Sequence, residues 1–307
     1  MKKTTSISRG KKFLKDYGGY VYVLPVIIGI ICFTLIPMVI SLIYSFCDYK
    51  FYEYEISNMY TNFGFQNYIR IFTSDWKDVG NSLFITFRYA ILMVVTGLVG
   101  SYILALFLNQ KIKGVAAFRI VYYLPCIIPA VAGTLLWRNI TDVNTGYINL
   151  IFQKIGLPAY TFYSAKSTVL PTILLLSVTG WGGNMVMWLA QMKNIPQEMY
   201  EVADLDGANY FQKLLRITLP MTTSMIFYLF ITSVIGSLQV FGAYYPLMTG
   251  INRSELNFIV IKIYTEGFVN YDMSYASALS WLLFMIIGIL TLTIFKTSKW
   301  VYYGEEN

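Results

Sequence analysis

The sequence predicts an all-α, polytopic membrane protein with six transmembrane helices and a cytoplasmic loop of two short helices. Three observations support this prediction. Hydrophobic residues make up 56% of the 307 residues and charged residues 13%, against about 25% charged in an ordinary soluble domain. Several apolar segments reach about 20 residues, the length that crosses a hydrocarbon core about 30 Å thick. The polar segment 193–220 lies between two of them and carries helix start and stop signals.

The first apolar segment, residues 20–46, follows a basic tail at 1–19. It is too long for a signal-peptide core and no small-residue cleavage site follows it, so it is expected to remain as a first span. Pro25 and Pro37 are expected to kink this span. The other five predicted spans are 79–108, 118–140, 168–192, 220–243 and 273–295. The chain therefore divides into an N-terminal tail at 1–19, a transmembrane domain at 20–296 and a C-terminal tail at 297–307.

The distribution of basic residues predicts the orientation. Six spans place both termini on one side, and cytoplasmic loops are enriched in Lys and Arg. With both termini inside, 14 basic residues are cytoplasmic and 7 are outside. The inner set is Lys2, Lys3, Arg9, Lys11, Lys12, Lys15, Lys111, Lys113, Arg119, Lys193, Lys213, Arg216, Lys296 and Lys299, and the outer set is Lys50, Arg70, Lys77, Lys154, Lys166, Arg253 and Lys262. This bias predicts that both termini and the 193–220 loop are cytoplasmic.

Composition disfavours several other classes of protein. The chain has no histidine, the commonest general base and metal ligand. Its three cysteines, Cys32, Cys47 and Cys126, are too few and too scattered for a disulfide framework or a metal site. The basic residues form no stripe with interleaved aromatics, so nucleic-acid binding is not expected. We therefore expect no metal and no cofactor, and an enzyme would have to work with carboxylates or lysine.

The 193–220 loop contains the signals of two short helices. Pro196 suits the first position of a helix and Gly207 suits the residue just after its end, which predicts a helix at about 196–206. Asn209 and Gln212 have the spacing of a capping box for a second helix, and Pro220 is expected to end that helix and start the fifth span. Such a hinged pair is suited to transmit a push from a partner, and an ordinary interfacial turn is the alternative.

The segment Glu201-Val-Ala-Asp-Leu-Asp-Gly207, continued to Ile217-Thr-Leu-Pro220, resembles the docking loop of binding-protein-dependent sugar ABC importer permeases. That pattern is E-A-A, three residues, G, nine residues, I, any residue, L-P, and the one departure is Val202 in place of an alanine. Weaker matches lie elsewhere: Asn81-Ser82, Tyr122-Tyr-Leu-Pro125, Trp137, Gly146, Asn149, Trp181 and Trp188-Leu-Ala.

The resemblance implies a non-enzymatic subunit of the bacterial cell membrane. Its expected partners are a second homologous permease, a dimer of ATP-binding cassette ATPases and an extracytoplasmic sugar-binding protein. It also implies an ATPase-coupling role for part of the loop, with a solvated acidic face as the alternative for Glu201, Asp204 and Asp206. The residues so implied are Glu201, Ala203, Asp204, Gly207, Ile217 and Pro220. The chain itself has no G-x-x-x-x-G-K-[ST] motif, so no P-loop is present.

Polar residues inside the predicted spans are candidates for the substrate pathway, because polar groups at depth usually face a bundle interior or a wet cavity. The candidates are Trp181, Asn184, Ser233, Ser237 and Gln239. The alternative is that they tie helices together. Arg88, two turns into the second span, is expected to snorkel outward, with substrate binding as the lesser role.

Two other function classes compete with a permease subunit. An ion-driven secondary transporter would favour intramembrane acids or an inverted repeat, and the predicted spans lack clear acids at mid-depth. A membrane-embedded enzyme is disfavoured by the missing histidine. The sequence leaves the sugar unnamed and keeps glycerol phosphates as an alternative substrate class.

Overall fold

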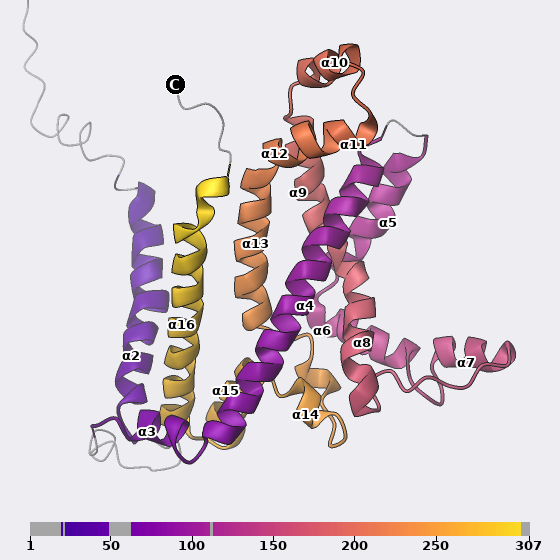
Figure 1. The fold of residues 1–307 in the computed structure, drawn as a ribbon. Helices are drawn as coiled ribbons and strands as arrows, with labels where there is room; N and C mark the ends of the chain where they lie inside the picture. Colours follow the sequence, from indigo (N-terminus) through magenta and orange to yellow (C-terminus); the bar gives the residue numbers. More distant parts are fainter. Residues whose placement is uncertain (1–19, 21, 49–62, 111–112, 302–307) are drawn as a thin grey trace, which may run out of the picture. The chain divides into compact units, whose positions relative to one another are not determined.

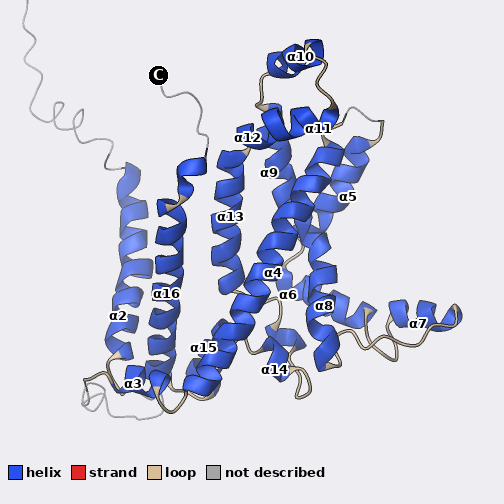
Figure 2. Ribbon diagram, in the orientation of Figure 1, coloured by secondary structure: helices blue, strands red, loops and turns tan. Residues whose placement is uncertain are grey.

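The computed structural model describes residue 20 and residues 22–48, 63–110 and 113–301. The predicted tail at 1–19, the residues 302–307, and Lys50 and Lys111 of the charge count lie outside the described residues. Over the described part every regular element is a helix, which confirms the all-α prediction (Figures 1 and 2).

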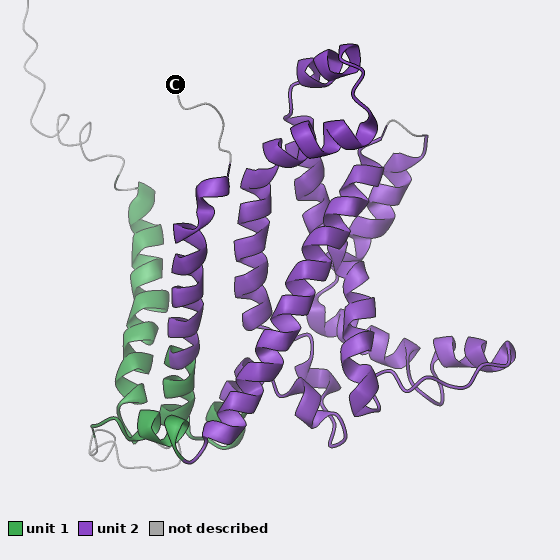
Figure 3. Ribbon diagram, viewed as in Figure 1, with its two compact units in different colours: residues 1–73, 265–281 green, residues 74–264, 282–307 purple. Residues whose placement is uncertain are grey.

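The chain forms two compact units (Figure 3). Unit 1 comprises Met1–Thr73 and Thr265–Trp281, and unit 2 comprises Ser74–Tyr264 and Leu282–Asn307. Helix α16, Met273–Lys296, is the sixth predicted span and contributes to both units.

Unit 1 contains the first span, Tyr22–Ser45. Its second half is a π-helical turn, η1 (Ile31–Leu35), followed by α2 (Ile36–Ser45). The Ile36 N–H donates to the Ile31 carbonyl, five residues back. Pro37 has no N–H to donate and its ring crowds the carbonyl four residues earlier, so a wider turn precedes it. The expected irregularity at Pro37 is therefore present as a π turn.

Short elements complete unit 1. In α3 (Gln66–Phe72), the Asn67 amide donates to the carbonyls of Ser45 (3.1 Å) and Cys47 (2.8 Å), which fixes α3 to the end of α2. Arg70 of the same helix pairs with Asp272 at 2.9 Å and lies over the ring of Tyr275. This cation links α3 to the start of α16, after the π turn η6 (Thr265–Val269).

Two long spans organise unit 2. Helix α4 (Trp76–Leu108) is a 33-residue helix, about 50 Å long at 1.5 Å per residue. The fourth span, Lys166–Lys193, runs through α8 (Lys166–Ser177), the 3₁₀ turn η3 (Val178–Gly180) and α9 (Trp181–Lys193). Helix α4 packs against both α9 and α13 (Thr223–Leu238). These three helices frame the centre of the unit.

The third predicted span is wrong as a continuous helix. Residues 118–140 belong to α5 (Val115–Ile127) and α6 (Ala130–Ile140), which meet at 103°. Ile128 is extended because a residue before proline is pushed out of the helical region, and Pro129 follows it. Pro125 also lacks the N–H of a regular turn. The pair is a broken span or a re-entrant loop.

The fifth predicted span begins later and ends earlier than residues 220–243. Pro220 lies in α12 (Leu219–Met221), and the chain bends by 64° at Thr222 before α13. The Thr222 hydroxyl donates to the Thr218 carbonyl, which satisfies backbone at the bend. The described chain thus holds four continuous spans, or six when each bent pair is one span.

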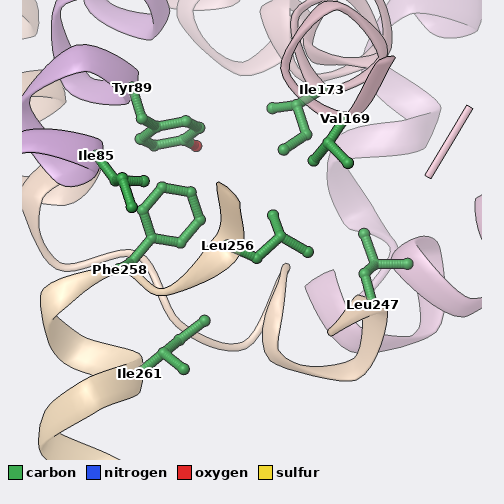
Figure 4. Close-up of a cluster of buried hydrophobic side chains, with 8 residues drawn as sticks. All are labelled: Ile85, Tyr89, Val169, Ile173, Leu247, Leu256, Phe258 and Ile261. Carbon is green, nitrogen blue, oxygen red and sulfur yellow. The ribbon is translucent and has the colours of Figure 1, made fainter. Parts of the chain in front are cut away.

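Short elements connect the spans at the end of unit 2 where α4 begins. They are α7 (Tyr147–Lys154), η5 (Tyr245–Leu247), α14 (Arg253–Leu256) and α15 (Ile259–Tyr264). A hydrophobic cluster joins η5, α14 and α15 to α4 and α8, with the ring of Tyr89 centred 4.9 Å from that of Phe258 (Figure 4). Its buried members are Ile85, Tyr89, Val169, Ile173, Leu247, Leu256, Phe258 and Ile261.

A second cluster binds α4, α9 and α13 nearer the other end of the unit. Trp188 is buried at its centre and donates its indole N–H to the Ser101 hydroxyl at 3.0 Å. A buried tryptophan contributes a large apolar area and needs a partner for its N–H. Here a serine one helix away supplies that partner, so this polar pair holds two spans together.

Candidate functional site

The first candidate site is the coupling loop, residues 193–220, whose first helix is α10 (Gln197–Leu205). Pro196, which we predicted as the first helical residue, is the N-cap, so the helix begins one residue later than predicted. Gly207 has φ +74°, a left-handed conformation that only glycine adopts without strain. Gly207 N donates to the Asp204 carbonyl at 3.1 Å and Ala208 N to the Ala203 carbonyl at 2.9 Å. These two bonds form a Schellman motif, so Gly207 is the residue after the helix end as predicted.

The second helix of the coupling loop opens with the predicted capping box. The Asn209 side chain accepts from Gln212 N at 2.9 Å, and the Gln212 side chain accepts from Asn209 N at 2.8 Å. This cap starts α11 (Tyr210–Lys213), which continues as the π turn η4 (Leu214–Thr218) and α12. The end of α10 and the start of α11 therefore both have their backbone groups satisfied by bonds within the loop.

The coupling loop presents apolar and acidic side chains together. Leu205 is 89% exposed and Val202 is 58% exposed. Glu201, Asp206 and Pro220 are also exposed, whereas Ala203 and Ile217 are half-buried. Asp204 forms an ion pair with Lys213 inside the loop, so this carboxylate already has a cation. The loop is firmly shaped yet leaves an apolar patch uncovered.

A side-chain hydrogen bond joins α10 to the base of the loop. The Tyr200 and Thr218 hydroxyls lie 2.8 Å apart. Both residues, with Lys213 and Asn109, line a cavity of about 240 Å³ beside the end of α4. A movement of α10 would therefore displace Thr218 at the end of η4, and η4 leads through α12 into α13.

The second candidate site is a cavity of about 280 Å³ among α4, the α8–α9 span and α13, here named the mid-span cavity. Four of the five predicted pathway residues line it, namely Trp181, Asn184, Ser233 and Ser237. Gln239 does not; it is the residue after the end of α13. Sequence reasoning missed Tyr89 and Ser177, which also line the cavity, because no local pattern shows which side chains of a span face the same space.

Two glycines allow the helices around the mid-span cavity to approach closely. A Cβ on Gly182 would lie 2.0 Å from the Tyr122 carbonyl oxygen, so α5 packs directly on the α9 backbone. A Cβ on Gly100 would lie 2.4 Å from the six-membered ring of Trp181. The Trp181 indole is thereby held against α4, and this contact covers part of its ring.

The polar residues that line the mid-span cavity differ in whether their donors already have a hydrogen-bond partner. The Ser237 hydroxyl donates to the Val234 carbonyl at 3.0 Å and that of Ser177 to the Leu174 carbonyl at 2.7 Å. Trp181 Nε1 is buried and has no partner among the described residues. Leaving a buried donor unpaired costs about 1–3 kcal/mol. Among the side chains that line the cavity, the Trp181 indole is the one with a buried donor left unpaired in the described part of the chain.

Arg88, which we expected to snorkel outward, has a carboxylate partner within the protein. Its guanidinium pairs with Glu255 of α14 at 2.5 Å, beside the Tyr89 cluster. A long cation within a span is stabilised by a carboxylate as well as by water at the interface. The sequence contained both residues, but nothing in it linked positions 167 residues apart.

Comparison with known proteins identifies the family. Residues 97–301 match the model of the binding-protein-dependent transport system inner membrane component family. This chain belongs to that family. It is 36% identical over 311 aligned positions to the probable ABC transporter permease protein YesP of Bacillus subtilis, covering 100% of this chain and 97% of YesP. It is 27% identical to the arabinooligosaccharides transport system permease protein AraP of Bacillus subtilis, covering 93% and 90%.

Comparison with a solved structure supports the fold of this chain. A chain of a bacterial alginate ABC transporter, in complex with an alginate pentasaccharide-bound periplasmic protein, superposes with a TM-score of 0.82. The match covers 95% of this chain and 98% of that one at 23% identity. The chain is therefore a multi-pass membrane protein with the fold of an ABC transporter permease.

Proposed function

We propose that this chain is one permease subunit of a heteromeric ABC importer and forms half of the translocation pathway for a carbohydrate. A second homologous permease would supply the other half, and an extracytoplasmic sugar-binding protein would deliver the substrate. The carbohydrate class rests on relatives such as AraP, whose name specifies arabinooligosaccharides. The bias of basic residues supports a cytoplasmic location for both termini and for the coupling loop.

The coupling loop is the observation that carries the proposal. It joins two spans, its helix ends are capped, and it exposes Leu205 and Val202 beside Glu201. Large apolar side chains are expensive to leave in water when they form a patch, and such patches mark interaction sites. The coupling surface would comprise Glu201, Ala203, Gly207, Ile217 and Pro220, with Asp204 held by Lys213. The partner would be a dimer of ATP-binding cassette ATPases.

The mid-span cavity supports the carbohydrate pathway. Its lining offers hydroxyl, amide and indole groups and contains no carboxylate, lysine or arginine. Saccharides present hydroxyls and apolar ring faces, which such a lining can match. Trp181, Asn184, Ser233 and Ser237 are the pathway residues, and Gln239 is at most a contributor at the end of α13.

Reconstitution tests the proposal. The chain alone in proteoliposomes is expected to move no arabinotriose and to hydrolyse no ATP, whereas the full assembly is expected to take up the sugar only with ATP hydrolysis. Glu201→Lys should weaken ATPase association because a cation replaces an exposed anion, and Glu201→Gln should have a smaller effect. Sugar transport by the purified chain alone, driven by an ion gradient, would instead establish a secondary transporter.

A further inference from the structure

A second polar cavity lies at the opposite end of unit 2 from α10 and is here named the α6 cavity (Figure 1). Its volume is about 180 Å³, which is room for about six water molecules at about 30 Å³ each. Its walls come from the end of α6, the segment before α8, η5 and the segment before α14. Its polar lining residues are Arg138, Thr141, Asp142, Tyr163, Ser164, Thr249 and Asn252.

The floor of the α6 cavity is held rigidly by buried side chains. Asn252 is fully buried, donates to the carbonyls of Tyr163 and Leu247 at 2.9 Å each, and accepts from Thr249 N at 2.7 Å. Asn149 is also buried and donates to the carbonyls of Asp142 and Tyr160 at 3.0 Å each. Three segments distant in sequence are therefore fixed before any ligand arrives.

The walls of the α6 cavity carry polar groups with capacity left. Arg138 uses Nη1 on the Pro246 carbonyl at 3.2 Å. The side-chain hydroxyls of Ser164 and Thr249 have no hydrogen-bond partner among the described residues. Asp142 Oδ1 accepts from Asn144 N, Thr145 N and the Thr145 hydroxyl, each at 2.9 Å, which leaves Oδ2. A cation, an anion and two hydroxyls thus surround one small space.

We propose that the α6 cavity is a saccharide-binding subsite at the outer mouth of the pathway, an inference that rests on the proposed function. A sugar ring carries adjacent hydroxyls, each able to donate to the Asp142 carboxylate and accept from Arg138, Ser164 or Thr249. Because the cavity contains one cation and one anion, it suits a polyhydroxylated ring better than a free ion. Lying opposite the coupling loop, it meets a sugar delivered from outside.

Cysteine protection in the full assembly tests the subsite. Ile251 lines the α6 cavity, is 61% exposed and contributes no polar group, so Ile251→Cys reports on occupancy without removing a proposed contact. A membrane-impermeant maleimide added outside sealed proteoliposomes should label it. Arabinotriose, lactose and alginate pentasaccharide are the probes. At ten times its Kd, a bound probe should slow labelling about tenfold, since the rate follows the free fraction.

Matched controls separate binding from other effects. Lys154→Cys lies on exposed α7 outside the cavity and should be labelled at a rate that no saccharide changes. The wild type measures any background from Cys32, Cys47 and Cys126. Adding Ser164→Ala or Thr249→Val to Ile251→Cys should weaken protection about two- to tenfold, the effect of one hydrogen bond.

Each outcome decides for or against the subsite. Slower labelling of Ile251→Cys but not of Lys154→Cys, with less slowing once Ser164→Ala is added, supports the subsite. No slowing by any of the three saccharides overturns it, as does labelling only from the inside or equal slowing at Lys154→Cys. If the wild-type assembly takes up sugar while Ile251→Cys is never protected, the subsite fails and the proposed function stands. If no ATP-driven uptake occurs, the proposed function itself fails.

Discussion

The two ends of unit 2 hold their connecting segments in different ways. In the coupling loop the capping bonds join residues three to five positions apart, as in the Asn209–Gln212 box. Around the α6 cavity the bonds are long-range: Asn252 reaches Tyr163, 89 residues away, and the Thr134 hydroxyl reaches the Ala243 carbonyl, 109 residues away. Both ends contain local bonds, but the bonds between segments about 90 or more residues apart occur at the α6 end, as at Asn252 and Thr134.

The difference has a physical consequence. A loop with local caps keeps its internal shape when it moves as a body, because its bonds travel with it. A frame of buried, long-range bonds loses several partners at once when one segment shifts, so it resists movement. We infer that the coupling loop moves as a body. The segments that Asn149 and Asn252 hold together around the α6 cavity, here named the α6 frame, stay fixed. The predictions below test this contrast, from the largest effect to the smallest.

The largest effect is expected at Gly146. A Cβ there would lie 2.4 Å and 2.5 Å from the carbonyl oxygen and nitrogen of Asp142. Because these are backbone atoms, Gly146→Ala should destabilise the protein by about 3 kcal/mol, at the upper end of overpacking costs. Thermal unfolding of the purified protein measures this. Gly250→Ala, where a Cβ meets nothing within 4 Å, is the matched control. If both variants unfold at the same temperature, the inference of a rigid α6 frame is wrong.

The next effect is expected at Asn252. Asn252→Ala removes three side-chain hydrogen bonds from a fully buried position. At about 0.5–1.5 kcal/mol for each bond, the loss should be about 1.5–4.5 kcal/mol, comparable with that at Gly146. Hydrogen exchange should accelerate at 247–249, where Thr249 N loses its acceptor, and remain unchanged at 197–213. Acceleration at both ends would mean that the two regions are not independent.

A smaller effect on stability, with a large effect on transport, is expected at Gly207. Gly207→Val places a β-branched residue at φ +74°, and the left-handed conformation costs about 1–2 kcal/mol. No atom lies within 4 Å of its Cβ position, so the strain stays local. The protein should insert and fold yet lose ATP-coupled uptake. Normal uptake at wild-type expression would contradict the hinge.

This contrast also explains what the sequence could predict. The helix end at Gly207 and the cap at Asn209 were predictable because their partners lie within a few residues. The broken third span was missed although Pro129 is visible, because a proline also occurs within continuous spans, as Pro171 does in α8. The Arg88–Glu255 pair and the Asn252 bonds depend on which helices lie side by side, and no local pattern encodes that.

Composition predicted part of the mid-span cavity. Trp181, Asn184, Ser233 and Ser237 were found because polar groups are rare within spans. Gln239 met the same criterion but follows the end of α13, since that helix is shorter than the apolar segment. A polar residue near a predicted boundary is therefore a weaker candidate than one at mid-span, because boundaries carry an error of about 2–4 residues.

The smallest effect is a dependence on pH at Asp142, in the turn that follows α6. The N–H of Thr145, the N–H of Asn144 and the Thr145 hydroxyl lower the pKa of Asp142. A carboxyl whose folded pKa is depressed stabilises the fold above its ordinary value, about 3.9, and this contribution is lost as pH falls through the folded pKa. Hydrogen exchange at Asn144 and Thr145 should therefore stay constant, after correction for intrinsic rates, from about pH 8 to 5 and rise below about pH 4.

Asp142→Asn should remove that rise because an amide oxygen accepts without titrating. The Asn209–Gln212 box uses amides alone, so its own hydrogen bonds should persist over the same range. A rise at Asn144 and Thr145 that persists in the Asp142→Asn variant would contradict the assignment of the titration to Asp142.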